Sequence, residues 1–77
     1  MIVVYTQDAT YIKKDADAAK DVLLSVYGEK LGAEAYAAVK NGREGTTYRV
    51  HGGPRVEIVS KEKAEWIKEK ETAIGMM

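Results

Sequence analysis

The sequence predicts a single α+β domain, and three observations support this prediction. Residues 2–13 and 46–59 have the β-branched and aromatic composition of strands, and each segment contains a turn signal. Residues 15–40 and 61–74 carry apolar side chains at the three- and four-residue spacing of helices. The order of these segments includes no β-α-β crossover that would require a parallel sheet, and 77 residues suffice for one hydrophobic core only.

Residues 2–13 are expected to form a β-hairpin. Residues 2–6 read Ile-Val-Val-Tyr-Thr and residues 10–13 read Thr-Tyr-Ile-Lys, both of which suit a pleated surface. The three residues between them, Gln7, Asp8 and Ala9, offer a short turn. The alternative is a single strand followed by an extended lead into the next segment.

Residues 15–40 are expected to be helical, either as one helix kinked at Gly28 or as two shorter helices that meet there. Asp15 is a good N-cap residue, and Asn41-Gly42 is a stop signal because both residues tolerate the left-handed conformation that ends helices. The apolar side chains that repeat with helical spacing are Ala19, Val22, Leu23 and Val26 before Gly28, and Leu31, Ala35, Tyr36 and Val39 after it.

Residues 46–51 and 55–59 are expected to pair as a second hairpin, with Gly52-Gly53-Pro54 as the turn. Alternation places Tyr48 and Val50 on one face of the first strand, and Val56 and Ile58 on one face of the second. These two strands follow the Asn41-Gly42 stop signal and a loop that includes Gly45.

A final helix is expected from Lys61 to about residue 74. Ser60 is placed to cap its N-terminus, and Gly75 is placed to end it. Its inward stripe is narrow, with Trp66 at the edge, and consists of Ala64, Ile67 and Ile74.

Composition restricts the available chemistry. The chain has no cysteine, which excludes disulfides and thiol chemistry, and its one histidine, His51, is too few for the usual structural metal site. The aspartates at positions 8, 15, 17 and 21 do not match the spacing of a calcium loop. Catalytic residues, a metal and a cofactor are therefore not expected.

The charge and hydropathy patterns indicate which binding partners and which cellular compartment to expect. Twelve basic and twelve acidic residues give a net charge of zero, which removes the global electrostatic argument for nucleic-acid or anionic-membrane binding. No apolar run approaches the ~20 residues of a membrane span, and the first residues lack a secretory pattern. We therefore expect no membrane association and a cytoplasmic location.

Basic residues on the second hairpin form the first candidate binding site. Arg43, Arg49, His51 and Arg55 flank a turn whose Gly52-Gly53 would let backbone approach a phosphate closely, and arginine forks suit phosphate well. No phosphate-loop or RNA-binding motif accompanies them. The competing interpretation is an ordinary solvated hairpin whose charges are balanced by Glu44 and Glu57.

Aromatic residues form the second candidate site. The chain has five tyrosines and no phenylalanine, and tyrosine is enriched at recognition surfaces. Tyr48 is expected on the sheet face and Tyr11 is expected to be exposed, because Lys13 and Lys14 follow it. Trp66 serves either as a flank of the core or as a binding anchor.

These observations favour a small non-enzymatic binding module that docks on a protein partner through a sheet face or a hairpin edge, as an inhibitor or regulator. Phage and mobile-element accessory proteins include many chains of this size. The alternative is nucleic-acid or phosphate-ligand binding through Arg43, Arg49, Arg55 and Tyr48. A homodimer formed through exposed hairpin edges is compatible with both functions.

Overall fold

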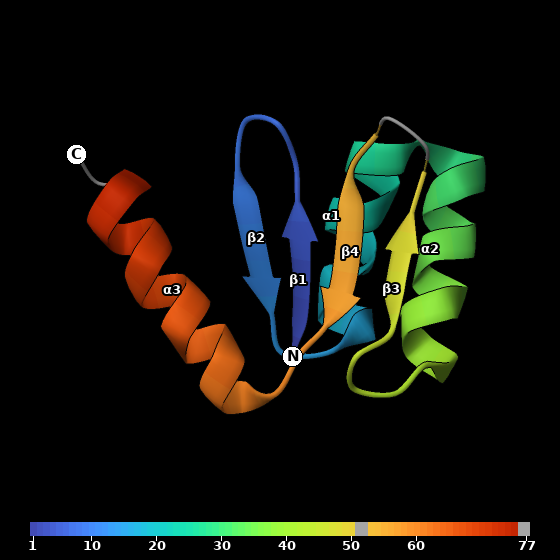
Figure 1. The fold of residues 1–77 in the computed structure, drawn as a ribbon. Helices are drawn as coiled ribbons and strands as arrows, with labels where there is room; N and C mark the ends of the chain where they lie inside the picture. Colours follow the sequence, from blue (N-terminus) through green and yellow to red (C-terminus); the bar gives the residue numbers. More distant parts are fainter. Residues whose placement is uncertain (51–52, 76–77) are drawn as a thin grey trace.

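The computed structural model describes residues 1–50 and 53–75, with side chains up to Lys70, and it confirms the α+β class (Figure 1). Two β-hairpins and three helices follow one another in the predicted order. Their bounds are β1 Ile2–Tyr5, β2 Thr10–Lys13, α1 Ala16–Tyr27, α2 Glu29–Asn41, β3 Thr47–Arg49, β4 Arg55–Ile58 and α3 Lys61–Gly75.

The strands form one antiparallel sheet in the order β2-β1-β4-β3. Both predicted hairpins are confirmed by the pairing of their strands, and β2 excludes the alternative of a single strand followed by an extended lead. Gly52 of the predicted second turn lies outside the described residues. The two central strands, β1 and β4, come from distant parts of the chain and pair with Val4 opposite Val56. The sheet therefore joins the first hairpin to the second, and β2 and β3 form its edges.

The segment between the hairpins forms two helices rather than one kinked helix. Gly28 separates them with a φ of 89°, a backbone conformation that side-chain-bearing residues rarely adopt. Asp15 caps α1 as predicted, because its Oδ1 accepts a hydrogen bond of 2.8 Å from the Ala18 N–H. α2 ends at Asn41 as predicted, but Gly42 ends it in an extended conformation, with a φ of −85°, and not in the left-handed one.

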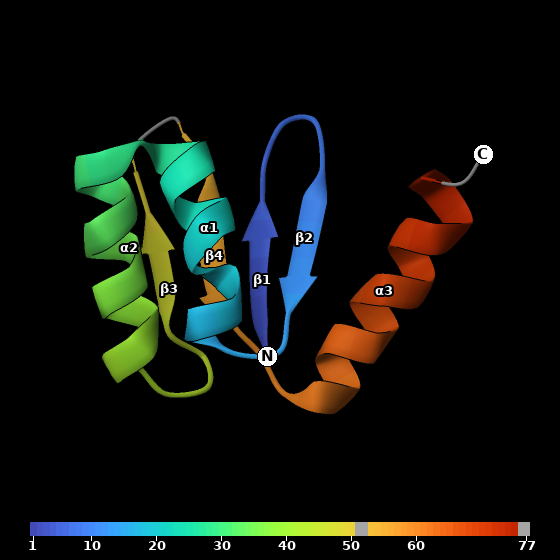
Figure 2. The same ribbon diagram turned by 180° about the vertical axis from the view of Figure 1, so that it is seen from behind.

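Helices α1 and α2 cover one face of the sheet (Figure 2). The core beneath them includes Leu23 of α1 and Val56 of β4, both of which are fully buried. The predicted apolar stripes are confirmed except at Leu31, which is 37% exposed. Gly32 is buried in its place, because that side of α2 contacts α1 too closely to admit a side chain.

Close contact between the two helices depends on Gly32. A Cβ atom at this position would lie 2.7 Å from the Leu24 Cα and 2.9 Å from the Leu23 carbonyl oxygen, both of which are backbone atoms of α1. On the surface the same two helices are joined by Tyr36, whose hydroxyl donates to Asp17 and accepts from Lys40. Side-chain hydrogen bonds therefore join α1 and α2 on the surface, and close backbone contact at Gly32 packs them together in the interior.

Helix α3 lies beside β2, at the opposite end of the sheet from β3 (Figures 1 and 2). Ser60 caps it as predicted, since its Oγ accepts from the Lys63 N–H at 3.1 Å. Ala64 and Ile67 are buried against Val3 in a second, smaller core. The predicted contribution of residue 74 lies outside the described side chains. No described segment lies in front of β4 and β3 in Figure 1, so this half of the face is open.

Candidate functional site

The face of the sheet opposite α1 and α2 carries a row of side chains that crosses all four strands. Residues directly opposite one another in antiparallel strands point to the same face. The register pairs Tyr5 with Arg55 of β4, and Arg55 in turn with Arg49 of β3. On its other side Tyr5 is opposite Thr10 of β2. The row therefore reads Thr10, Tyr5, Arg55 and Arg49 from one edge of the sheet to the other.

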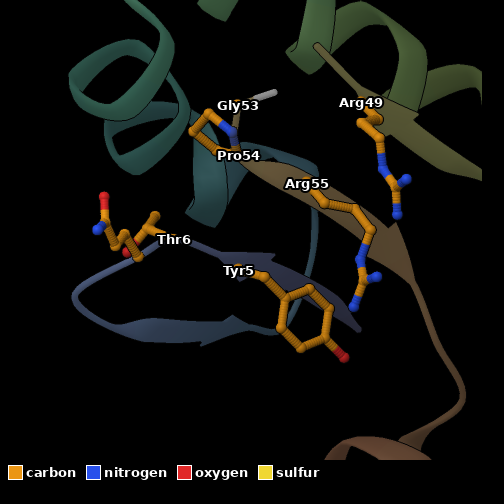
Figure 3. Close-up of a pocket in the computed structure, with 7 residues that line it drawn as sticks. Tyr5, Thr6, Arg49, Gly53, Pro54 and Arg55 are labelled. Carbon is orange, nitrogen blue, oxygen red and sulfur yellow. The ribbon is translucent and has the colours of Figure 1, made fainter. Parts of the chain in front are cut away.

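Arg49 and Arg55, hereafter the arginine pair, are close neighbours in this row. The Ile58 N–H donates to the Thr46 carbonyl at 2.9 Å, and hydrogen-bonded pairs alternate along an antiparallel ladder. The 49–55 pair is therefore a non-hydrogen-bonded one, the type in which side chains approach most closely, at a Cα separation of about 4.5 Å. Figure 3 shows the two side chains running side by side. Such an arrangement of like charges is destabilising.

Tyr5 supports the inner member of the arginine pair. The Arg55 guanidinium carbon lies 4.2 Å from the centroid of the Tyr5 ring, a cation–π contact. Partial burial raises the pKa of the Tyr5 hydroxyl, the charge of Glu57 adds to this rise, and Arg55 opposes it. The ring therefore stays neutral at physiological pH and positions the guanidinium by its face.

Glu57 lies two residues from Arg55 on the same face of β4, but it forms no ion pair with the arginine pair. Glu57 forms its ion pair with Lys63 of α3, at 3.7 Å, and no described carboxylate forms an ion pair with either guanidinium. The Arg55 Nε is buried and has no hydrogen-bond partner among the described residues. A buried donor without an acceptor costs about 1–3 kcal/mol.

These side chains line a hollow of about 650 Å³, hereafter the arginine pocket (Figure 3). Two turns at the same end of the sheet form its rim. Thr6 closes the first turn, since its Oγ1 donates to the Ala9 carbonyl at 2.7 Å and accepts from the Ala9 N–H at 2.9 Å. The lining residues are Tyr5, Thr6, Gln7, Arg49, Gly53, Pro54 and Arg55.

Tyr27 of α1 positions the second turn of the rim through a contact with Pro54. Its hydroxyl donates to the Pro54 carbonyl at 2.8 Å, and its ring packs edge-on against Tyr48 with a centroid separation of 5.6 Å. The last residue of α1 is thereby tied to the residue that precedes β4. Burial raises the pKa of the Tyr27 hydroxyl to about 12, and the neighbouring Tyr48 adds to the shift.

The Tyr27 contact predicts a loss of stability at alkaline pH. The unfolded chain releases this proton near pH 10 and the folded chain retains it to about pH 12, so stability falls as pH rises through that interval. Urea titrations at several pH values should show a shallower decline in Tyr27→Phe. At neutral pH this variant should lose about 0.5–1.5 kcal/mol with its hydrogen bond. An unchanged alkaline decline would contradict the buried position of Tyr27.

The other predicted site residues lie apart from the arginine pair. Tyr48 points to the opposite face, beneath the helices, and Arg43 lies in the α2–β3 loop at the far end of the sheet (Figure 1). Tyr11 is 39% exposed as predicted and lies on the α1 side of β2. Trp66 is 55% exposed on α3, with Lys70 4.5 Å above its ring. His51 lies outside the described residues.

Sequence reasoning did not identify the residues that complete the pocket. Tyr5, Thr6 and Gln7 belong to the first hairpin, and only the pairing of β1 with β4 brings them to the arginine pair. Alternation within residues 1–5 does place Tyr5 on the face opposite Val4. No local signal identifies the strand that pairs with β1.

The described residues hold no group of three or more His, Asp or Glu side chains that is suited to a metal ion. Within the same residues, no helix combines the length and the apolar character needed to cross a membrane. Comparisons of the chain with models of protein families, with curated proteins and with solved structures give no match. The arginine pocket is therefore interpreted from its own geometry.

Proposed function

We propose that this chain is a small non-enzymatic module that docks on a protein partner, as an inhibitor or regulator, and that its arginine pair receives an acidic group of that partner. One observation carries the proposal. Two guanidinium groups lie side by side on opposed strand positions, with no described carboxylate paired to either.

An acidic group would relieve the unfavourable arrangement of charge. It would offset the repulsion between the two guanidinium groups and accept hydrogen bonds from their terminal N–H groups. Arginine binds carboxylates through two parallel hydrogen bonds, which fix the orientation of the ligand as well as strengthening its binding. Hydrogen bonds that involve a charged group contribute about 1.5–3 kcal/mol each.

The surroundings of the pocket favour an acidic protein segment over a nucleic acid. The net charge of the chain is zero, and Glu57 lies next to the arginine pair on the same face. A nucleic-acid backbone carries a phosphate at every nucleotide and favours an extended basic surface. The second candidate function is nonetheless phosphate or nucleic-acid binding, because the same arginine pair is also suited to one phosphate group.

The arginine pair can be tested with a displayed library of short peptides of random sequence. Selection on the wild-type protein should enrich peptides that contain Asp or Glu. The affinity of a selected peptide should fall about 10–100-fold in each of the single variants Arg49→Gln and Arg55→Gln, as expected for the loss of a charge-assisted hydrogen bond. Arg43→Gln is the matched control, since Arg43 lies in the loop before β3 and is hydrogen-bonded to Thr46, at the opposite end of β3 from Arg49.

Two results would overturn this assignment. Enriched peptides without acidic residues, or an equal loss in Arg43→Gln, would show that the arginine pair does not select the ligand. A fluorescent single-stranded oligonucleotide provides the second arm. If it binds with a steep salt dependence that is lost in Arg49→Gln, while the acidic peptides do not bind, the second candidate function replaces the first.

A further inference from the structure

Strand β3 ends the sheet with an unpaired edge. Within the described part of the chain it pairs with β4 only, through its hydrogen-bonded residue Tyr48. The N–H and C=O groups of Thr47 and Arg49 therefore point away from β4, since successive residues alternate in direction. Both residues are exposed. A row of unpaired backbone groups of this kind is a template for an added strand.

Helix α2 extends past this edge in both views of the molecule (Figures 1 and 2). The side of α2 that contacts α1 includes Gly32 and Tyr36. Leu31, Ala35 and Ala38 follow one another at spacings of four and three, which places Leu31 and Ala38 on the flank away from α1. Leu31 is one of three large apolar side chains that are exposed among the described residues, at 37%. The edge of β3 is thus bordered by an exposed apolar flank of α2.

We propose that the partner binds as an extended strand along the outer edge of β3, and this inference rests on the proposed function. A fifth strand would continue the row of Tyr5, Arg55 and Arg49 by one position. A side chain at that position would lie beside Arg49, where a carboxylate complements the charge. The residues before and after it would point to the other face, toward Leu31 and Ala38. The recognised segment is therefore an acidic residue flanked on both sides by apolar residues.

Charge disfavours a second copy of this chain as the occupant. An antiparallel β3–β3 pair centred on Tyr48 would place Arg49 opposite Thr47 of the other copy. The arginine pair of each copy would then lie on one continuous sheet face, without an added carboxylate for either. An acidic strand would compensate the positive charge of the arginine pair, whereas a second copy would double it. Charge complementarity therefore favours the acidic strand.

The peptide backbone provides a test that leaves the protein unchanged. Peptides selected on the wild-type protein should contain the apolar-acidic-apolar pattern. Methylation of one peptide nitrogen at a time should weaken binding at least about tenfold at alternate residues and little at those between, since only alternate N–H groups of a strand face its neighbour. Saturation with peptide should also slow amide hydrogen exchange at Thr47 and Arg49.

The protein side is tested at Thr47, whose N–H points outward and takes no part in the β3–β4 ladder. Thr47→Pro removes this donor at an edge position that tolerates proline, and should weaken peptide binding at least about tenfold. Thr47→Val retains the N–H and should bind as the wild type does. Circular dichroism of both variants establishes that they are folded.

The failure of this inference is distinct from failure of the proposed function. If acidic peptides bind through the arginine pair, but methylation shows no alternation and the Thr47 and Arg49 amides stay unprotected, strand addition is wrong and the pocket assignment stands. If no acidic peptide binds, the proposed function itself fails. If the two amides become protected in free protein as its concentration rises, a second copy occupies the edge and the inference fails.

Discussion

Replacing Leu23 with Ala is expected to remove most of the stability of the fold. Leu23 is fully buried and lies where α1 packs on the sheet. Buried Leu→Ala substitutions lower the free energy of unfolding by about 2–5 kcal/mol, through lost transfer energy and the cavity that remains. Single cores of about this size rarely supply more than about 3–5 kcal/mol in total. Urea titration followed by circular dichroism should show a variant that is largely unfolded.

The same substitution at Leu31 provides a matched control. Leu31 belongs to the neighbouring helix but is 37% exposed, so Leu31→Ala should lower the free energy of unfolding by less than about 1 kcal/mol. The comparison isolates burial from helix propensity, because both substitutions exchange the same residue types within helices. Equal losses at the two positions would contradict the orientation of the helix pair on the sheet.

Gly32→Val is expected to destabilise the protein by about 2–3 kcal/mol through overpacking between α1 and α2. Helix propensity alone predicts the opposite sign, since valine is a few tenths of a kcal/mol more favourable than glycine in a helix interior. The atoms that a new Cβ would meet include the Leu24 Cα and the Leu23 carbonyl, which belong to the backbone. They cannot turn aside as a side chain would. Urea titration measures the change.

Ala33→Val is the control for this substitution, because Ala33 is exposed on the same turn of α2. It should lower the free energy of unfolding by only about 0.6 kcal/mol, the difference in helix propensity between the two residues. If Gly32→Val is neutral or stabilising, the two helices do not approach as closely as the structure places them.

Local chemistry explains why so much of the fold is predictable from the sequence. Asp15 and Ser60 each lie directly before a helix and cap it through their own side chains, and Gly28 separates two helices because its conformation suits few other residues. The exception, Leu31, shows the limit of periodicity. A helical repeat identifies an apolar stripe, but a tight helix–helix contact can bury glycine and expose the leucine beside it.

The candidate site was predictable only in part, since Arg49 and Arg55 belong to one hairpin whereas Tyr5 belongs to another. Hairpin pairing is a local property and brings the two arginines together. The contact of Arg55 with Tyr5 depends on which strand β1 pairs with beyond its own hairpin, which no neighbouring residue specifies. For the same reason the sequence did not separate Arg43 from the arginine pair, although the structure places it at the far end of the sheet.

The pairing of β1 with β4 has a consequence for when the site exists. Tyr5 and Arg55 are separated by most of the chain, so the pocket forms only when the second hairpin docks on the first. A nascent chain that ends before β4 has the first hairpin with Tyr5 and both helices, but it lacks Arg55 and the strand that carries it. Recognition is therefore a property of the finished sheet alone. A ligand that bridges its two halves would in turn stabilise the whole domain against unfolding.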